Sequence, residues 1–136
     1  MIGKFMRAAM KRGWVIVMIG PSGTGKTFML ERTIPGKIID KSALAMKGAD
    51  KVAFDLSEVP ADRFAIDEPM VFDGASLRAG IATLRGRGFA MAFQQSRTID
   101  ILGLTEELLT HHKCIALFVN GRRGNSLWWT NSEYWQ

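Results

Sequence analysis

The sequence has little of what a secreted or membrane-spanning protein needs. Its 136 residues include one cysteine, Cys114, so no disulfide can form within the chain. No N-terminal stretch combines a basic start with an apolar run long enough for secretion or for crossing a membrane. We therefore expect a soluble, cytoplasmic protein without a transmembrane segment.

Internal repeats, low-complexity tracts and Ser/Pro-rich linkers are also missing, so nothing in the sequence marks a domain boundary. A chain of this length is typical of one globular domain, and its 47% hydrophobic residues can form a core without disulfides or metal. We expect a single domain over residues 1–136.

Acidic residues are scarcer than basic ones. Thirteen Asp and Glu face eighteen Lys and Arg, which leaves a formal net charge of +5. A basic surplus favours nucleic acid or another anionic surface as a partner, but it does not choose between them.

Apolar runs alternate with helical patterns along most of the chain. Strands are predicted at residues 14–19, 37–40, 64–67, 89–93 and 114–119, with 51–56 as a further strand or edge segment, and helices at 2–12, 26–33, 75–86 and 105–112. This alternation predicts an α/β fold of three layers, with a mainly parallel central sheet between helices. A Gly-rich turn after residue 119 predicts an antiparallel C-terminal hairpin.

The stretch "GPSGTGKT" fits the phosphate-loop pattern G-x-x-x-x-G-K-[ST], with an apolar strand before it and a helix after it. Glycines let backbone N–H groups point at phosphate oxygens, and the helix adds its positive N-terminal end. Lys26 supplies a charge for the β and γ phosphates, and Thr27 offers a hydroxyl to Mg²⁺. The alternative is an ordinary strand-to-helix turn. The predicted ATP-binding residues are Gly20, Pro21, Ser22, Gly23, Thr24, Gly25, Lys26, Thr27 and Phe28.

An acidic pair, Asp67 and Glu68, ends the short apolar segment in "RFAIDEP". The pair resembles the Walker B element of nucleotide hydrolases. In that reading Asp67 holds Mg²⁺ and Glu68 polarises the water that attacks the γ phosphate. The alternative is a plain turn at the end of a strand.

Amide side chains follow the next predicted strand, in "FAMAFQQSRTIDILGL". If the two strands are neighbours, Gln94 or Gln95 lies beside the acidic pair and can sense the γ phosphate or the water. A phosphate loop, an acidic "DE", a helix ending in "LRGRG" and a strand ending in Gln together resemble the HerA/FtsK group of P-loop ATPases, which includes the Zot-like phage assembly proteins. The resemblance covers residues 14–120 and matches "TIDILGL" to a helix of the group.

The resemblance implies a P-loop NTPase fold and a ring-forming ATPase that pumps or threads DNA. Gln95 matches the strand-end glutamine of the group, and one of Arg85, Arg87 and Arg97 would reach into the nucleotide site of a neighbouring subunit. We count Arg97 with Lys26, Glu68 and Gln95 as catalytic; for Arg85 and Arg87 the alternative is solvation of a helix end.

The expected function is a Mg-dependent ATPase, a homo-oligomeric subunit or accessory in DNA transfer or packaging by a phage, plasmid or other mobile element. Two alternatives stay open. A nucleotide or small-molecule kinase shares the phosphate loop but needs an acceptor pocket. A non-catalytic adaptor binds ATP and a protein partner without hydrolysis.

Other features give weaker indications. His111, His112 and Cys114 lie close together, but neighbouring helical residues point in different directions and no fourth ligand is near, which argues against a metal site. The basic N-terminal helix can cover a sheet edge or touch a membrane.

The C-terminal stretch "RRGNSLWWTNSEYW" mixes cations with aromatic rings. Arg122 and Arg123 followed by Trp128 and Trp129 would suit nonspecific binding of single-stranded DNA by stacking. The alternative is that the tryptophans pack on the sheet or on a partner.

Overall fold

The computed structural model describes residues 2–21, 26–33, 36–46, 51–119 and 125–130. Its strands form one sheet in the order β2-β3-β4-β1-β5-β6. They are β1 (Trp14–Ile19), β2 (Lys37–Asp40), β3 (Phe64–Asp67), β4 (Phe89–Phe93), β5 (Lys113–Val119) and β6 (Asn125–Thr130). Strands β1 to β5 are parallel, and β6 pairs antiparallel with β5. The predicted α/β class with a mainly parallel sheet is therefore confirmed.

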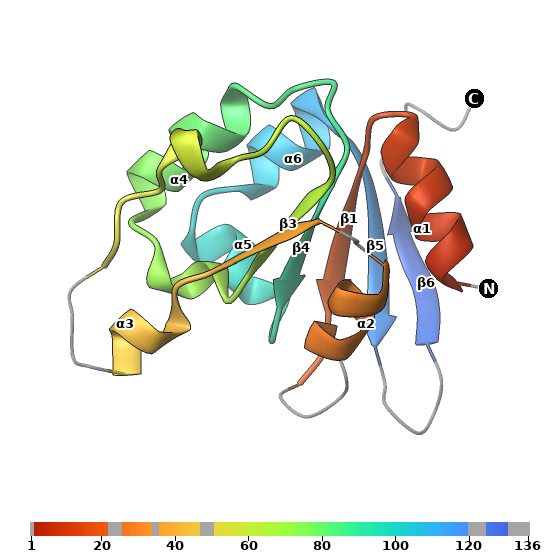
Figure 1. Ribbon diagram of the computed structural model, residues 1–136, viewed down its shortest axis with the longest axis horizontal. Helices are drawn as coiled ribbons and strands as arrows, with labels where there is room; N and C mark the ends of the chain where they lie inside the picture. Colours follow the sequence, from red (N-terminus) through yellow and green to blue (C-terminus); the bar gives the residue numbers. More distant parts are fainter. Residues whose placement is uncertain (1, 22–25, 34–35, 47–50, 120–124, 131–136) are drawn as a thin grey trace.

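Helices cover both faces of the sheet. They are α1 (Ile2–Lys11), α2 (Lys26–Thr33), α3 (Ser42–Met46), α4 (Gly74–Ala82), α5 (Arg97–Ile101) and α6 (Thr105–His111), with short 3₁₀ helices η1 (Leu56–Glu58) and η2 (Pro69–Val71). Figure 1 shows α4, α5 and α6 to the left of β1 and β5, and α1 to their right.

Strand β1 explains why the sheet has two buried faces. Val15 and Val17 pack in the core cluster shared with α4 and α6, whereas Ile16 and Met18 pack in the cluster shared with α1 and α2. All four side chains have no exposed area. A continuous apolar run is the pattern that such a two-sided strand requires.

Helix α1 lies very close to the segment that leads into β4. A Cβ atom on Gly88 would lie 2.0 Å from the backbone oxygen of Met10, so only glycine allows this approach. Gly13, with φ of 86°, follows the helix in the left-handed conformation that commonly ends helices. These glycines fix how α1 docks on the sheet.

Residues 51–56 do not form the predicted strand. Val52 makes only an isolated parallel bridge with Phe72, and the chain then enters η1. The Asp55 carboxylate accepts hydrogen bonds from the backbone N–H and the hydroxyl of Ser57, which turns the chain away from an extended path. The helix predicted at 75–86 is also shorter, since α4 ends at Ala82.

Candidate functional site

The residues predicted to handle the nucleotide lie at the carboxyl edge of the sheet. Strand β4 lies between β3 and β1, so the segments that follow these three strands are neighbours. The Gly20 N–H donates to the Phe93 oxygen at 3.0 Å and ties the start of the loop to the end of β4. This edge is where open parallel sheets bind their ligands.

Lys26 begins α2 and is largely buried, with 8% of its surface exposed. Its Nζ donates to the backbone oxygens of Gly20 and, at 2.9 Å, of Pro21. Burial lowers the pKa of Lys26, while the negative charges of Glu68 and Asp67 act in the opposite direction. A partly desolvated cation at the start of α2 is suited to bind an anion. Ser22, Gly23, Thr24 and Gly25 lie outside the described residues, as does the side chain of Phe28.

Thr27 and Asp67 meet across the site although they are far apart in the sequence. The Thr27 hydroxyl on α2 donates to Asp67 Oδ2 at the end of β3, over 2.8 Å. Asp67 is 3% exposed, and its Oδ1 accepts the backbone N–H of Glu68 at 3.0 Å. A hydroxyl and a carboxylate side by side are hard oxygen ligands that fit Mg²⁺.

Glu68 has a left-handed backbone, with φ of 52° and ψ of 55°. It is the one residue other than glycine with positive φ in the part of the chain that the structure describes. Pro69 follows and disfavours the right-handed helical conformation for Glu68. Such a conformation costs about 1–2 kcal/mol. Backbone strain of this kind occurs often at functional sites.

A cavity of about 270 Å³ opens beside Glu68, between η2, the end of β4 and α5. Its polar lining includes Glu68, Gln94, Gln95 and Arg97, and Met70 and Ile101 add apolar surface. The structure therefore brings three of the four predicted catalytic residues, Glu68, Gln95 and Arg97, to one cavity.

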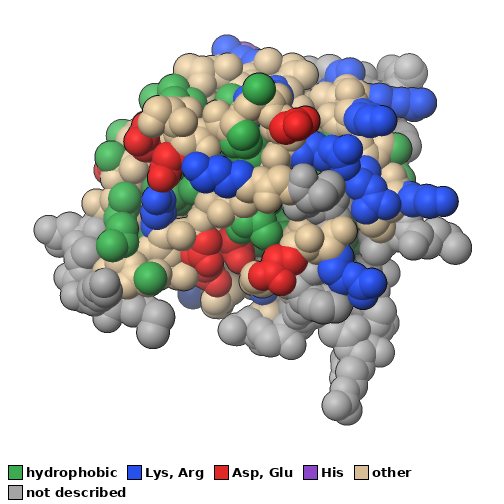
Figure 2. All heavy atoms as spheres, in the orientation of Figure 1, with side chains coloured by type: hydrophobic (Ala, Val, Ile, Leu, Met, Phe, Trp, Pro, Cys, Tyr) green, Lys and Arg blue, Asp and Glu red, His purple; other side chains and the backbone are tan. Residues whose placement is uncertain are grey.

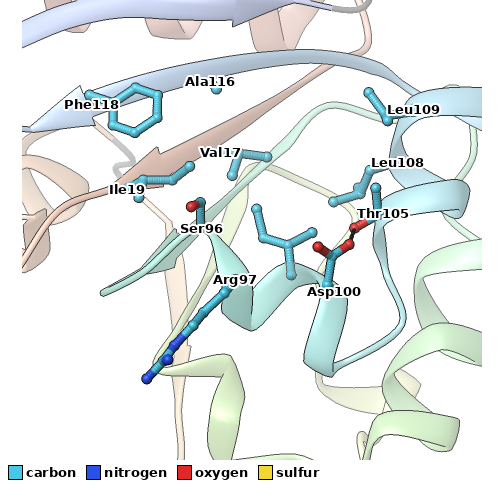
Figure 3. Close-up of a pocket in the computed structure, with 11 residues that line it drawn as sticks. Val17, Ile19, Ser96, Arg97, Asp100, Thr105, Leu108, Leu109, Ala116 and Phe118 are labelled. Carbon is cyan, nitrogen blue, oxygen red and sulfur yellow. Dashed lines mark hydrogen bonds between the residues drawn. The ribbon is translucent and has the colours of Figure 1, made fainter.

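A second, mostly apolar cavity of about 400 Å³ lies on the other side of α5. Val17, Ile19 and Phe118 form part of its floor, and α5 and α6 cover it. In Figure 3 the Arg97 side chain extends away from these apolar residues, and Thr105 is hydrogen-bonded to Asp100. Arg97 borders both cavities and is exposed.

Arg85 and Arg87 lie at the other end of β4, just before the strand begins. Two nitrogens of Arg85 donate to the Glu107 carboxylate at 2.8 and 2.6 Å. Arg87 donates to the backbone oxygens of Pro60 and, at 2.6 Å, of Asp62. Both arginines are engaged within the chain, and neither lies with the residues predicted to handle the nucleotide. Of the three arginines considered, only Arg97 is at the carboxyl edge.

The His111, His112 and Cys114 group lies at the amino edge of the sheet. His112 is 2% exposed, and its Nε2 lies 3.0 Å from Glu107 Oε2. Burial lowers the pKa of His112, and burial raises the pKa of the Cys114 thiol to about 12. Within the described residues, no three His, Cys, Asp or Glu side chains gather in a possible metal site.

Sequence reasoning missed Glu107, which contacts both Arg85 and His112, and the apolar rim residues Met70 and Ile101. Apolar residues at helical spacing predict core positions, yet Ile101 is 64% exposed. No local signal marks these contacts, because each depends on residues brought together by the fold.

The prediction for the C-terminal stretch falls mostly outside what the structure describes. Arg122 and Arg123 lie outside the described residues, and for Trp128 and Trp129 the structure gives only the backbone of β6.

None of the described helices is long and apolar enough to cross a lipid bilayer. Comparisons with protein-family models, with curated proteins and with solved structures gave no significant match.

Proposed function

We propose that the protein is a Mg-dependent ATPase that works at the carboxyl edge of its sheet. One observation carries the proposal: the Thr27 hydroxyl and the Asp67 carboxylate, forty positions apart, lie 2.8 Å from each other. The two residues come from separate sequence patterns, each of which predicts a Mg²⁺ ligand. Lys26, predicted to contact phosphate, adjoins Thr27 in the same turn of α2.

The residues divide the chemistry among them. Lys26 and the N-terminal end of α2 attract the phosphates, and Thr27 and Asp67 hold Mg²⁺, which supplies positive charge against the phosphate oxygens. Glu68 accepts a proton from the attacking water, and Gln95 orients that water. The cavity beside Glu68 gives the water a place next to both side chains.

The resemblance to HerA/FtsK ATPases adds a finer proposal: a homo-oligomeric ring that acts in DNA transfer or packaging for a mobile element. Arg97 fits the role of an arginine supplied to a neighbouring subunit, because it is exposed at the same edge as Glu68. In that arrangement hydrolysis requires two subunits.

The cavity beside Glu68 also favours a second candidate, a kinase. A volume of about 270 Å³, lined by Gln94, Gln95 and Arg97, has room for an acceptor molecule with hydrogen-bonding groups. In that case Glu68 takes the proton from an acceptor hydroxyl instead of water.

Product analysis separates these activities. Purified protein with Mg·ATP releases free phosphate if it is an ATPase; a kinase yields ADP without matching free phosphate once its acceptor is present.

Glu68→Gln should lower turnover by about 10²-fold or more and retain ATP binding. Glu106→Gln, an exposed carboxylate on α6, is the matched control and should leave turnover unchanged. Equal turnover in wild type and Glu68→Gln would refute the proposed role of Glu68, and ATP binding without turnover under any condition would favour the adaptor.

A further inference from the structure

The first thirty residues contain no Asp or Glu. Four cations, Lys4, Arg7, Lys11 and Arg12, lie on or directly after α1. This helix and the residue after it thus contribute +4 to a chain whose formal net charge is +5. The basic surplus of the protein is therefore concentrated locally.

Three of these cations form a stripe along α1. Lys4, Arg7 and Lys11 are spaced by three and four residues, which places them on one side of a helix over about 10 Å. The opposite side, with Met6 and Met10, is buried in the core. Figure 2 shows Lys and Arg side chains gathered on the side of the molecule where α1 lies, at the right of the view.

The stripe has no partner among the described residues. The structure pairs none of Lys4, Arg7 and Lys11 with a carboxylate or a carbonyl from the described ranges. Other cations of the chain are engaged: Lys41 with Glu58, Arg85 with Glu107, and Arg78 with the Leu102 oxygen. A row of free cations costs stability through self-repulsion, which an external anion would relieve.

We propose that this stripe binds the phosphodiester backbone of a nucleic acid. A closely spaced row of cations complements a duplex, which carries one negative charge per about 1.7 Å of axis. Backbone contacts by Lys and Arg carry no sequence information, so binding is independent of base sequence.

An anionic membrane surface fits the stripe less well. Amphipathic helices that bind membranes insert their apolar face into the lipid. In α1 that face packs against the sheet: Met6 has no exposed area, and Met10 is 4% exposed. Among the large apolar side chains described on α1, only Phe5 is exposed, at 38%, so the cations dominate the surface that the helix offers for contact.

The helix that carries the stripe packs against the helix that begins the candidate nucleotide site. Helix α1 packs against both β1 and α2, and α2 begins with Lys26 and Thr27. The inference rests on the proposed action on DNA but not on ATP hydrolysis, because phosphate-backbone binding needs no nucleotide. Its failure and the failure of the ATPase proposal are therefore separate outcomes.

The test measures fluorescence anisotropy of a labelled DNA duplex with the full chain, without nucleotide. The variant K4Q/R7Q/K11Q removes the stripe. The control K37Q/K41Q/K51Q removes three charges that lie on or follow β2, a strand at one edge of the sheet. Circular dichroism and thermal melts establish that both variants fold, and K4Q/K11Q replaces the triple variant if the change at the partly buried Arg7 prevents folding.

The stripe variant should lose salt sensitivity as well as affinity. Each duplex phosphate contact contributes about 0.9 to the logarithmic salt slope, so three lost contacts lower it by about 2.7. Between 50 and 200 mM salt, wild-type affinity should then fall about 40-fold more than that of the stripe variant.

Three results would overturn the proposal. One is failure of the wild type to bind the duplex at low salt. Another is equal weakening of binding by the two triple variants, which would indicate an effect of net charge and not of a site. Stripe-dependent binding to vesicles of anionic phospholipid, without stripe-dependent duplex binding, would instead assign the surface to membranes.

Discussion

Lys26 is the residue whose removal tests the phosphate loop most directly. Among the described residues, its Nζ donates to backbone oxygens at the start of the loop, so Lys26→Ala should leave the core intact. Hydrogen bonds to charged groups contribute about 1.5–3 kcal/mol, so Mg·ATP should bind at least about tenfold more weakly. Calorimetry measures this, with Lys37→Ala as an exposed control. Wild-type ATP affinity in a folded Lys26→Ala protein would remove the phosphate-loop assignment.

The Thr27 hydroxyl has a structural effect that is separate from any nucleotide. Thr27→Val keeps the shape of the side chain but leaves Asp67 Oδ2 without its described donor. An unsatisfied acceptor in a carboxylate that is 3% exposed costs about 1–3 kcal/mol. We expect urea denaturation without nucleotide to show that loss. Thr110→Val, at an exposed position of α6, should leave stability near wild type. Equal stability of all three proteins would mean that the hydroxyl contact contributes nothing.

At the scale of elements, the junction of α6 and β5 predicts a pH dependence of stability. Burial lowers the pKa of His112, and Arg85 lowers the pKa of Glu107. The unfolded chain therefore binds protons more readily at both positions. Stability contributed by neutral His112 is present above its unfolded pKa, near 6.5, and falls as pH drops below it. The stability contributed by ionised Glu107 is lost at lower pH, as the pH falls below the ordinary pKa of a glutamate.

The charged groups around His112 do not reverse the direction in which its pKa is shifted. Glu107 faces His112 Nε2 and raises its pKa, whereas Arg85 and His111 lower it, and burial is the largest effect. His112→Gln should flatten the stability profile between pH 7 and pH 5, measured by urea denaturation at several pH values. His111→Gln, at the exposed neighbour, should keep the wild-type slope. A wild-type slope in His112→Gln would contradict the assignment.

The elements differ in how well the sequence predicts them. Strand β1 was predicted correctly because six consecutive apolar residues, "WVIVMI", suit only a position buried on both sides. Residues 51–56 have apolar character too, but the Asp55 contacts with Ser57 override it. Helix α5 was indicated by the resemblance and not by periodicity, because five residues are too few to show a helical repeat.

At the scale of the molecule, the sequence predicts which residues gather at one edge of the sheet. Segments that follow parallel strands leave from the same edge, and the sequence predicts Gln94 or Gln95 beside the acidic pair on the condition that their two strands are neighbours. The strand order, with β3 next to β4, meets that condition. Contacts between particular side chains cannot be predicted from the order of strands in the sequence. Arg85 meets Glu107 over 22 positions of sequence, and the fold alone determines that contact.

Arg97 gives the last prediction, which concerns the assembled protein. Its side chain is exposed at the mouth of the cavity that contains Glu68, where a neighbouring subunit can meet it. If Arg97 completes the site of another subunit, hydrolysis per subunit should rise with protein concentration. Glu68→Gln and Arg97→Ala should each be nearly inactive alone, and mixing them should restore activity, because some interfaces then combine an intact Glu68 with an intact Arg97. Steady-state phosphate release measures this, and Arg32→Ala, on the exposed end of α2, serves as the control for loss of an arginine. A mixture no more active than the sum of its separate variants, at every concentration, would place Arg97 outside any shared site.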